Sequence, residues 1–135
     1  MLVVDCSAAV AMVQGTPHGK ALRALTLTGE EMVAPDILPY ELANVAWKMT
    51  HADTATGKEA RQLVEDCLAL VDTLYDAKPL LAEVLHESRR LDHPAYDIFY
   101  LVLARRLDAC LLTLDKPLIR LCVENGIDVV QEIAV

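Results

Sequence analysis

The sequence predicts a single α/β domain with a mostly parallel central sheet of four to five strands, flanked by helices. Short, wholly apolar runs alternate along the chain with longer segments whose apolar residues recur at helical spacing. The chain has 135 residues, enough for one domain to build a core without disulfides. Apolar residues make up 54% of it and aromatic residues only 4%, so aliphatic side chains must fill the core. We therefore treat residues 1–135 as one domain.

The expected strands are short runs with few polar residues. The first consists of Leu2-Val3-Val4 and ends at Asp5, as expected for a parallel strand buried on both faces. Neighbouring parallel strands need long crossover connections, which the helices between the runs supply. The expected strands are residues 2–5, 32–34, 110–114 and 127–130, with a weaker candidate at 74–77.

Prolines and glycines mark the ends of the expected helices. Proline is favoured in a first helical turn, and five of the helices begin at one. Ser7 is the expected cap of the first helix, and Asp92 or His93 that of the sixth. Asn125-Gly126 could form a hairpin turn, but the preceding helical spacing favours a helix C-cap. The expected helices cover residues 8–13, 17–27, 39–52, 58–74, 79–91, 94–107 and 117–124.

Charge, cysteine content and hydropathy exclude several classes of protein. The net charge of −8 argues against broad, unspecific nucleic-acid binding, but permits a nucleic acid held locally through metal. The longest apolar run, residues 98–104, is too short to span a membrane, and the N-terminus lacks a basic signal region. The cysteines and histidines are scattered, which disfavours zinc, and we expect reduced thiols in a cytoplasmic protein. A role for Cys6, beside Asp5, stays open.

Four acidic residues stand at the edges of apolar elements. Asp5 and Asp115 follow two of the apolar runs, whereas Glu41 and Asp97 lie just inside two helices. Parallel strands end at the same sheet edge, where open α/β folds bind ligands, so we expect the carboxylates to converge on one pocket. Carboxylates repel one another unless a cation joins them, and Mg²⁺ and Mn²⁺ prefer oxygen ligands. We call Asp5, Glu41, Asp97 and Asp115 the four acids.

The segments around the four acids resemble the motifs of the PIN domain, in particular of its VapC-type toxin branch. The resemblance covers nearly the whole chain, in the family's order. Cys6 departs from it, because Ala, Thr or Ser is commoner there, and so does Ile98, where Ala is usual. The matching segments are Val4-Asp5-Cys6-Ser7-Ala8, Pro39-Tyr40-Glu41-Leu42-Ala43-Asn44-Val45, residues 94–104 with Tyr96-Asp97, and Leu112-Thr113-Leu114-Asp115-Lys116-Pro117-Leu118.

The resemblance implies a Mg²⁺- or Mn²⁺-dependent endoribonuclease that hydrolyses RNA phosphodiester bonds. It also implies a homodimer and inhibition by a small antitoxin protein, as in a type II toxin–antitoxin pair. Asp5 and Asp97 would ligate the metal directly, and Asp115 through water or at a second ion. Glu41 would position or deprotonate the attacking water. The RNA target, the antitoxin and the preferred metal stay open.

Further residues complete this hypothesis. Ligating carboxylates need orienting hydrogen bonds, for which the candidates are Ser7, Asn44 and Thr113. The basic residues that could approach the phosphate backbone are Lys48, Lys116 and Arg120. The alternative is a non-catalytic PIN-fold module that binds RNA or protein without cutting, although all four acids argue against it. A phosphohydrolase of the haloacid-dehalogenase type is excluded, because Ser7 stands where its second aspartate belongs.

Overall fold

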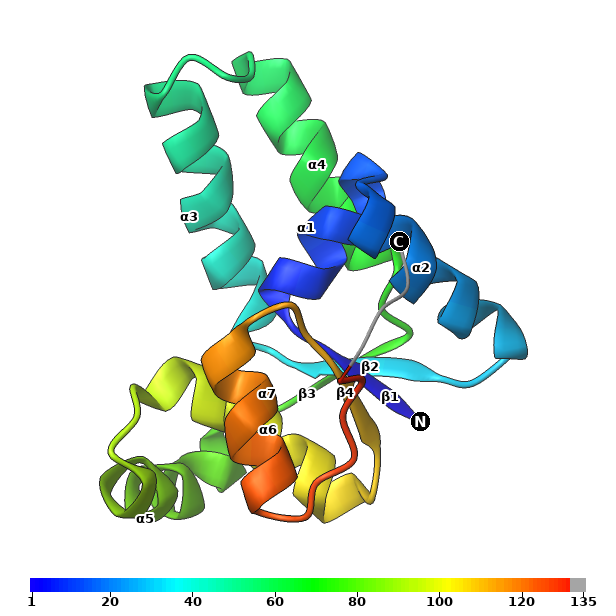
Figure 1. The fold of residues 1–135 in the computed structure, drawn as a ribbon. Coiled ribbons are helices and arrows are strands. Elements are labelled where there is room, and N and C mark those ends of the chain that lie inside the picture. Colours follow the sequence, from blue (N-terminus) through cyan, green and yellow to red (C-terminus); the bar gives the residue numbers. More distant parts are fainter. Residues whose placement is uncertain (132–135) are drawn as a thin grey trace.

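The computed structural model describes residues 1–131, in which four strands form one parallel sheet (Figure 1). The strand order is β3-β2-β1-β4, and Val3 pairs with Val33 on one side and with Leu111 on the other. The predicted fold class is confirmed. The strands are β1 (Leu2–Val4), β2 (Met32–Pro35), β3 (Thr73–Tyr75) and β4 (Cys110–Leu112).

Helices cover both faces of the sheet. In Figure 1, α1, α2 and α4 lie on one side, and α5, α6 and α7 on the other, while α3 and α4 project from the sheet as a pair. Within residues 1–131 no helix is both long and apolar enough to cross a lipid bilayer. The helices are α1 (Cys6–Gln14), α2 (Pro17–Leu25), α3 (Leu38–His51), α4 (Gly57–Ala69), α5 (Leu81–Leu91), α6 (Ala95–Leu107) and α7 (Lys116–Glu124), with 3₁₀ turns at Thr26–Thr28 and Lys78–Leu80.

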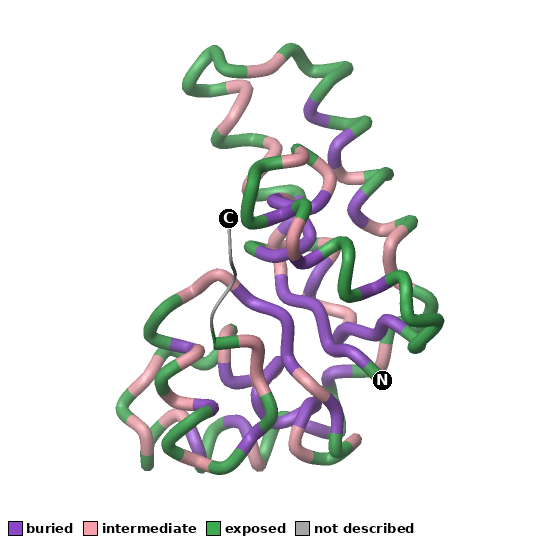
Figure 2. Tube along the Cα trace, turned by 45° about the vertical axis from the view of Figure 1, so that its right-hand side comes forward, coloured by how far each residue is buried: buried purple, intermediate pink, exposed green. Residues whose placement is uncertain are grey.

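The core is formed by the sheet together with residues of the helices that cover it, and α6 is the helix buried most completely. Strand β1 is buried along its whole length, and α6 is buried on nearly every side from Tyr100 to Ala104 (Figure 2). A helix that is apolar all round belongs in the interior, which explains the apolar run at 98–104. The tip of the α3–α4 pair is exposed by contrast. The acids at the ends of β1 and α6 are therefore carried by the most buried elements of the domain.

One glycine contact and one N-cap fix the position of helix α1. A side chain at Gly19 of α2 would place its Cβ 1.9 Å from the carbonyl oxygen of Ala11, so only glycine permits this contact between the helices. Asp5 caps α1, because its Oδ1 accepts a hydrogen bond of 2.9 Å from the Ala8 N–H. The prediction of Ser7 as the cap is wrong, since the helix begins one residue after Asp5.

Several other predicted boundaries differ from the structure: the strand predicted at 110–114 ends at Leu112, for example, and three differences change an element or its cap. The segment 127–130 forms no full strand, because only Val129 bridges to Leu111 of β4. The helix predicted to reach residue 74 ends at Ala69, since residues 73–75 pair with β2 as β3. The sixth helix begins at Ala95 without a side-chain cap, and Asp92 instead ends α5 in the left-handed conformation, with φ of 51°.

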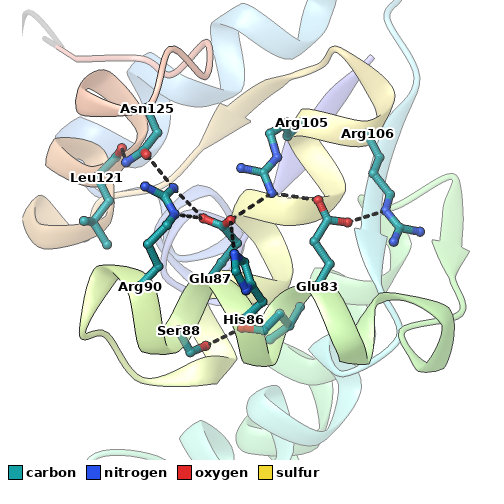
Figure 3. A network of polar contacts seen from close by, with 10 residues as sticks. Glu83, His86, Glu87, Ser88, Arg90, Arg105, Arg106, Leu121 and Asn125 are labelled. Atoms are coloured by element: carbon teal, nitrogen blue, oxygen red, sulfur yellow. Dashed lines mark hydrogen bonds and ion pairs between the residues drawn. The ribbon is translucent and has the colours of Figure 1, made fainter.

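An ion-pair network joins α5 to α6 and α7 (Figure 3). Glu87 is its centre: its side chain is only 8% exposed and its Oε2 lies 2.5 Å from Arg90 Nη2. Arg105 bridges both glutamates of α5, at 2.7 Å from Glu83 Oε1 and 3.6 Å from Glu87 Oε1. Arg90 also donates to the side chain of Asn125 after α7. Each carboxylate of this α5–α6 network thus has its own guanidinium partner.

Candidate active site

The structure brings the four acids together at the carboxyl edge of the sheet. Asp5 follows β1, and Asp115 lies three residues after the neighbouring strand β4. Glu41 and Asp97 lie in the first turns of α3 and α6. All four line one pocket of about 330 Å³, which we call the acidic pocket. The catalytic and metal-binding roles of these residues stay predictions.

Four helix N-termini meet at the acidic pocket. Asp5 and Asp115 are the N-cap residues of α1 and α7, while Glu41 and Asp97 belong to the first turns of α3 and α6. A helix N-terminus carries partial positive charge and stabilises a nearby carboxylate by about 0.3–1 kcal/mol. The backbone therefore offsets part of the repulsion among the four acids. The same backbone charge favours an approaching phosphate.

Asp5 is the most tightly held of the four acids. It is only 5% exposed, and hydrogen bonds reach both of its carboxylate oxygens. Its Oδ1 accepts from the Ser7 hydroxyl at 2.7 Å as well as from the Ala8 N–H, and its Oδ2 accepts from the Thr113 hydroxyl. These donors fix the plane of the carboxylate, as a metal ligand requires.

The same two hydroxyls fasten the loop that carries Asp115. Ser7 Oγ accepts a hydrogen bond of 3.0 Å from the Leu114 N–H, and Thr113 Oγ1 accepts one of 3.0 Å from the Asp115 N–H. Each hydroxyl therefore donates to Asp5 and accepts from the loop after β4. The positions of Asp5 and Asp115 are coupled through these side chains, although the residues are far apart in sequence.

Glu41 has a buried partner that the sequence reasoning missed. The Tyr100 hydroxyl donates a hydrogen bond of 2.6 Å to Glu41 Oε1, and Tyr100 itself is almost fully buried. Tyr100 follows Asp97 by three residues in a helix, so both lie on one face. That spacing could have identified it. The hydrogen bond orients Glu41 toward the acidic pocket.

Asp97 is paired with His93, which the sequence reasoning had considered only as a scattered histidine or a helix cap. His93 Nε2 lies 2.8 Å from Asp97 Oδ2. The left-handed Asp92 turns the chain between α5 and α6, and His93 follows it directly. The spacing of four residues from Asp97 is the signal that could have revealed this pair.

Burial and the charge of neighbouring carboxylates oppose ionisation of Asp5, Glu41 and Asp115. Burial raises the pKa of Asp5 to about 6, against the hydrogen bonds that lower it. Burial also raises the pKa of Glu41, with a smaller contribution from the charge of Asp97. The pKa of Asp115 is raised by burial and by the nearby Asp97 carboxylate. None of the residues within 1–131 that line the acidic pocket is a lysine or an arginine. A cation bound here would reduce the repulsion among these carboxylates.

The donor chemistry of the acidic pocket fits Mg²⁺ or Mn²⁺. Burial, together with the charges of Glu41 and Asp5, raises the pKa of the Cys6 thiol to about 12, so Cys6 offers no thiolate as a nucleophile or zinc ligand. Across residues 1–131, no three His, Cys, Asp or Glu side chains are placed so that they enclose one ion. Mg²⁺ keeps several waters and is commonly bound by one or two carboxylates, which this arrangement supplies.

The remaining candidate residues do not lie in the acidic pocket. Asn44 and Lys48 line a neighbouring pocket, and no hydrogen bond joins Asn44 to the four acids within the described residues. Lys116 lines a separate pocket with Leu114 and His18. Arg120 is exposed on α7. Of the three predicted orienting residues, only Ser7 and Thr113 contact one of the four acids directly.

The parallel α/β fold with acidic residues at the carboxyl ends of its strands is that of a PIN domain. Residues 2–124 match the PIN domain family. The chain belongs to that family. It is 30% identical over 121 residues to ribonuclease VapC3 of Pyrobaculum aerophilum, covering 87% of this chain and 91% of that protein. It is also 30% identical over 118 residues to ribonuclease VapC1 of Mycobacterium tuberculosis, strain CDC 1551, covering 84% and 88%. The resemblance to the VapC-type branch is confirmed.

The fold also matches a solved structure. The crystal structure of PAE2754 from Pyrobaculum aerophilum superposes with a TM-score of 0.71, covering 88% of this chain and 84% of that one. The two sequences are 22% identical, so this likeness bears on the fold alone.

Proposed function

We propose that this protein is a metal-dependent endoribonuclease that hydrolyses RNA phosphodiester bonds as the toxin of a type II toxin–antitoxin pair. The observation that carries the proposal is the acidic pocket, in which the four acids meet without a lysine or arginine among its lining residues in the described chain. The relatives named ribonuclease VapC support the choice of RNA as substrate.

In this proposal Asp5 and Asp97 hold Mg²⁺ or Mn²⁺, and Asp115 binds through water or at a second ion. The bound metal would lower the pKa of water and neutralise charge that builds on the phosphate. The chain's own part is to hold its carboxylates in place. Ser7 and Thr113 do this for Asp5 through their hydroxyls, and His93 does it for Asp97 through the contact of 2.8 Å.

Glu41 is the proposed general base. Its raised pKa brings it nearer to neutral pH, where a base accepts a proton most effectively. It would take the proton of the attacking water, while the water oxygen bonds to phosphorus and the ester oxygen leaves. The Tyr100 hydroxyl keeps Glu41 Oε1 in a fixed direction during this transfer.

The phosphate backbone would be held by the helix N-termini around the pocket and by Lys48, which lines the adjoining pocket. Lys116 and Arg120 lie elsewhere on the surface and would contact RNA only beyond the cleaved bond. This arrangement suits a chain with a net charge of −8, because its attraction for RNA is confined to the site.

The test compares the wild type with Asp5→Asn on transfer RNA and ribosomal RNA, with Mg²⁺ and with EDTA. Asp5→Asn should lower cleavage by at least about a hundredfold, because the amide keeps the shape but not the charge. Mg²⁺ should raise the melting temperature of the wild type, and that of the variant less. In EDTA the variant should be at least as stable as the wild type, since it relieves repulsion.

The matched control is Asp66→Asn, an exposed acid on α4 whose partner Gln62 can also pair with an amide. It should cut RNA like the wild type. A wild type that is indifferent to EDTA, or an Asp5→Asn variant with full activity, would overturn the metal-nuclease proposal. A wild type that binds RNA without cutting would favour the non-catalytic module.

The partners are a separate part of the proposal. A short antitoxin segment would lie across the acidic pocket and offer an arginine or lysine to the four acids, where charge-assisted hydrogen bonds are strong. The chain would form a homodimer in the cytoplasm. Co-expression with the product of a neighbouring small gene, followed by light scattering on the purified complex, tests both statements. Recovery of only a free monomer would count against them.

A further inference from the structure

A second pocket of about 440 Å³ opens beside the acidic pocket. The two pockets share Cys6, Glu41 and Val45, so no other element separates them. The volume lies within the range of sites that bind small molecules. We call this second hollow the tyrosine pocket, because Tyr40 and Tyr96 line it.

The two tyrosines present their rings to solvent. Tyr40 is 75% exposed and Tyr96 is 66% exposed. Aromatic residues make up only 4% of the chain, so two exposed tyrosines at one pocket are a notable concentration. Each immediately precedes one of the four acids in the sequence, Glu41 or Asp97. Within residues 1–131 the one aromatic stack joins Trp47 to His51, so neither tyrosine ring rests on another ring. Their faces are available to a planar ligand.

Two polar side chains complete the tyrosine pocket. Asn44 and Lys48 follow Glu41 by three and seven residues in α3, so all three share one helix face. Asn44 carries an amide that can donate and accept hydrogen bonds at a base edge. Lys48 is the one positively charged residue in the described chain that lines either of the two pockets.

We propose that the tyrosine pocket holds one unpaired nucleobase of the RNA, next to the phosphate that is cleaved. The inference rests on the proposed ribonuclease function and adds the form of its substrate. A base stacks on an exposed tyrosine ring, while Asn44 meets its edge and Lys48 its phosphate. A base in a duplex is stacked and paired, so the pocket selects single-stranded RNA. Stacking adds no negative charge to a site that already holds the four acids.

The test measures binding of fluorescently labelled ten-nucleotide single-stranded RNA by anisotropy in EDTA, where the metal-dependent cut cannot occur. A set of RNAs carries one abasic nucleotide at each successive position. For the wild type, one abasic position should weaken binding by about 5- to 100-fold, the range expected for one stacked base. Tyr40→Ala and Tyr96→Ala should weaken binding of intact RNA and remove the sensitivity to that position.

The controls separate ring stacking from structural effects. Tyr40→Phe and Tyr96→Phe keep the ring and should bind like the wild type. Trp47→Ala removes another exposed ring of α3 that lines neither pocket, and should also bind like the wild type. Circular dichroism should show every variant folded, since both tyrosines are exposed; if an alanine variant unfolds, Tyr→Leu at that position replaces it.

Several outcomes would overturn the inference: alanine variants that bind like the wild type, phenylalanine variants that lose as much as alanine, equal effects of all abasic positions, or no RNA binding. Alanine variants that bind RNA normally but lose the antitoxin would assign the pocket to a protein segment, which also overturns it. Position-dependent binding without cleavage in Mg²⁺ would refute the proposed function alone. Cleavage that ignores both tyrosines would refute the inference alone.

Discussion

The acidic pocket and the α5–α6 network both gather carboxylates, but only the network pairs them with arginines. Glu87 is bound by Arg90 and Arg105, and these contacts hold its pKa below the ordinary value. No arginine or lysine of the described chain lines the acidic pocket, and the pKa of Asp5 rises to about 6. The same residue type therefore behaves in opposite ways within one domain.

The comparison distinguishes carboxylates that stabilise the fold through ion pairs from carboxylates that remain available to bind a ligand. In the network each acid has a partner in the chain, so its role is complete on folding. In the acidic pocket the described chain supplies oriented oxygens and no arginine or lysine among the lining residues, and in our proposal the countercharge is a bound metal ion. An arrangement that costs stability in the free protein is typical of a functional site. The following predictions test this contrast.

The largest expected difference is in the pH dependence of stability without metal. Burial raises the folded pKa of Asp5 from 3.8 to about 6, so the folded state holds its proton longer than the unfolded state. The free energy of unfolding must then fall as the pH rises through that interval, by up to about 3 kcal/mol from Asp5. Urea unfolding in EDTA at several pH values should show this slope, and Asp5→Asn should flatten it.

The network should act in the opposite direction. Partial burial raises the pKa of Glu83, but hydrogen bonds from Arg105 and Arg106 outweigh it and lower the pKa, so Glu83 and Glu87 lose their contribution as the pH falls below their ordinary value of 4.5. If wild type and Asp5→Asn show the same slope between about pH 4 and pH 6, the acidic pocket is not strained as described.

Thr113→Val should weaken metal binding by about 10- to 100-fold, because the variant removes the hydroxyl that donates to Asp5 Oδ2. Titration calorimetry with Mn²⁺ measures the effect. Thr26→Val is the matched control: Thr26 is also buried and hydrogen-bonded, but to Arg23, away from the pocket. Equal metal affinities of the two variants would refute the orienting role of Thr113.

Glu87→Gln should destabilise the protein by about 1–2 kcal/mol without altering RNA cleavage, because it weakens hydrogen bonds to charged arginines outside the acidic pocket. Chemical denaturation and a cleavage assay on the same sample give both values. Glu124→Gln, at the exposed end of α7, serves as the control and should change neither. Loss of cleavage in a folded Glu87→Gln variant would contradict the separation of the two regions.

Tyr100→Phe should have the smallest effect, a loss of up to about tenfold in kcat/KM. The Tyr100 hydrogen bond lowers the pKa of Glu41 against the effect of burial, so its removal should move the acid limb of the pH–rate profile to higher pH. Tyr75→Phe, at the half-buried last residue of β3, is the control and should leave the profile unchanged. An unshifted acid limb in Tyr100→Phe would remove Glu41 from the role of base.

The sequence predicted elements whose pattern is local, and missed features that depend on tertiary pairing. The wholly apolar run of β1 and the proline that opens α3 were sufficient for both elements. The segment 127–130 has the composition of a strand, but pairing at the sheet edge stops at one bridge. Composition does not show how far the pairing with a neighbouring strand extends. The sequence therefore predicted a full strand at 127–130 where the structure has a single bridge.

The site was predictable to the extent that its acids lie at element boundaries. Asp5 and Asp115 follow adjacent parallel strands, a relation that the fold class alone implies. The sequence did not reveal the partners Tyr100 and His93, because Tyr100 resembles any core residue of a helix and His93 any residue of the loop before one. The approach of the Tyr100 side chain in α6 to Glu41 in α3, and the turn at Asp92 that places His93, depend on tertiary structure.

The pairing of β1 with β4 has a consequence for how the protein is made. Leu2 pairs with Met32 on one side and with Cys110 on the other, so one edge of the first strand stays unpaired until residue 110 has been synthesised. Contacts so distant in sequence form late, after a long loop has closed. An unfinished chain on the ribosome contains Asp5 and Glu41, but neither Asp115 nor the Thr113 hydroxyl that holds Asp5. In the proposed nuclease, a site assembled in this order is complete only after Asp115 has been synthesised, so the RNA around an earlier nascent chain is not cut.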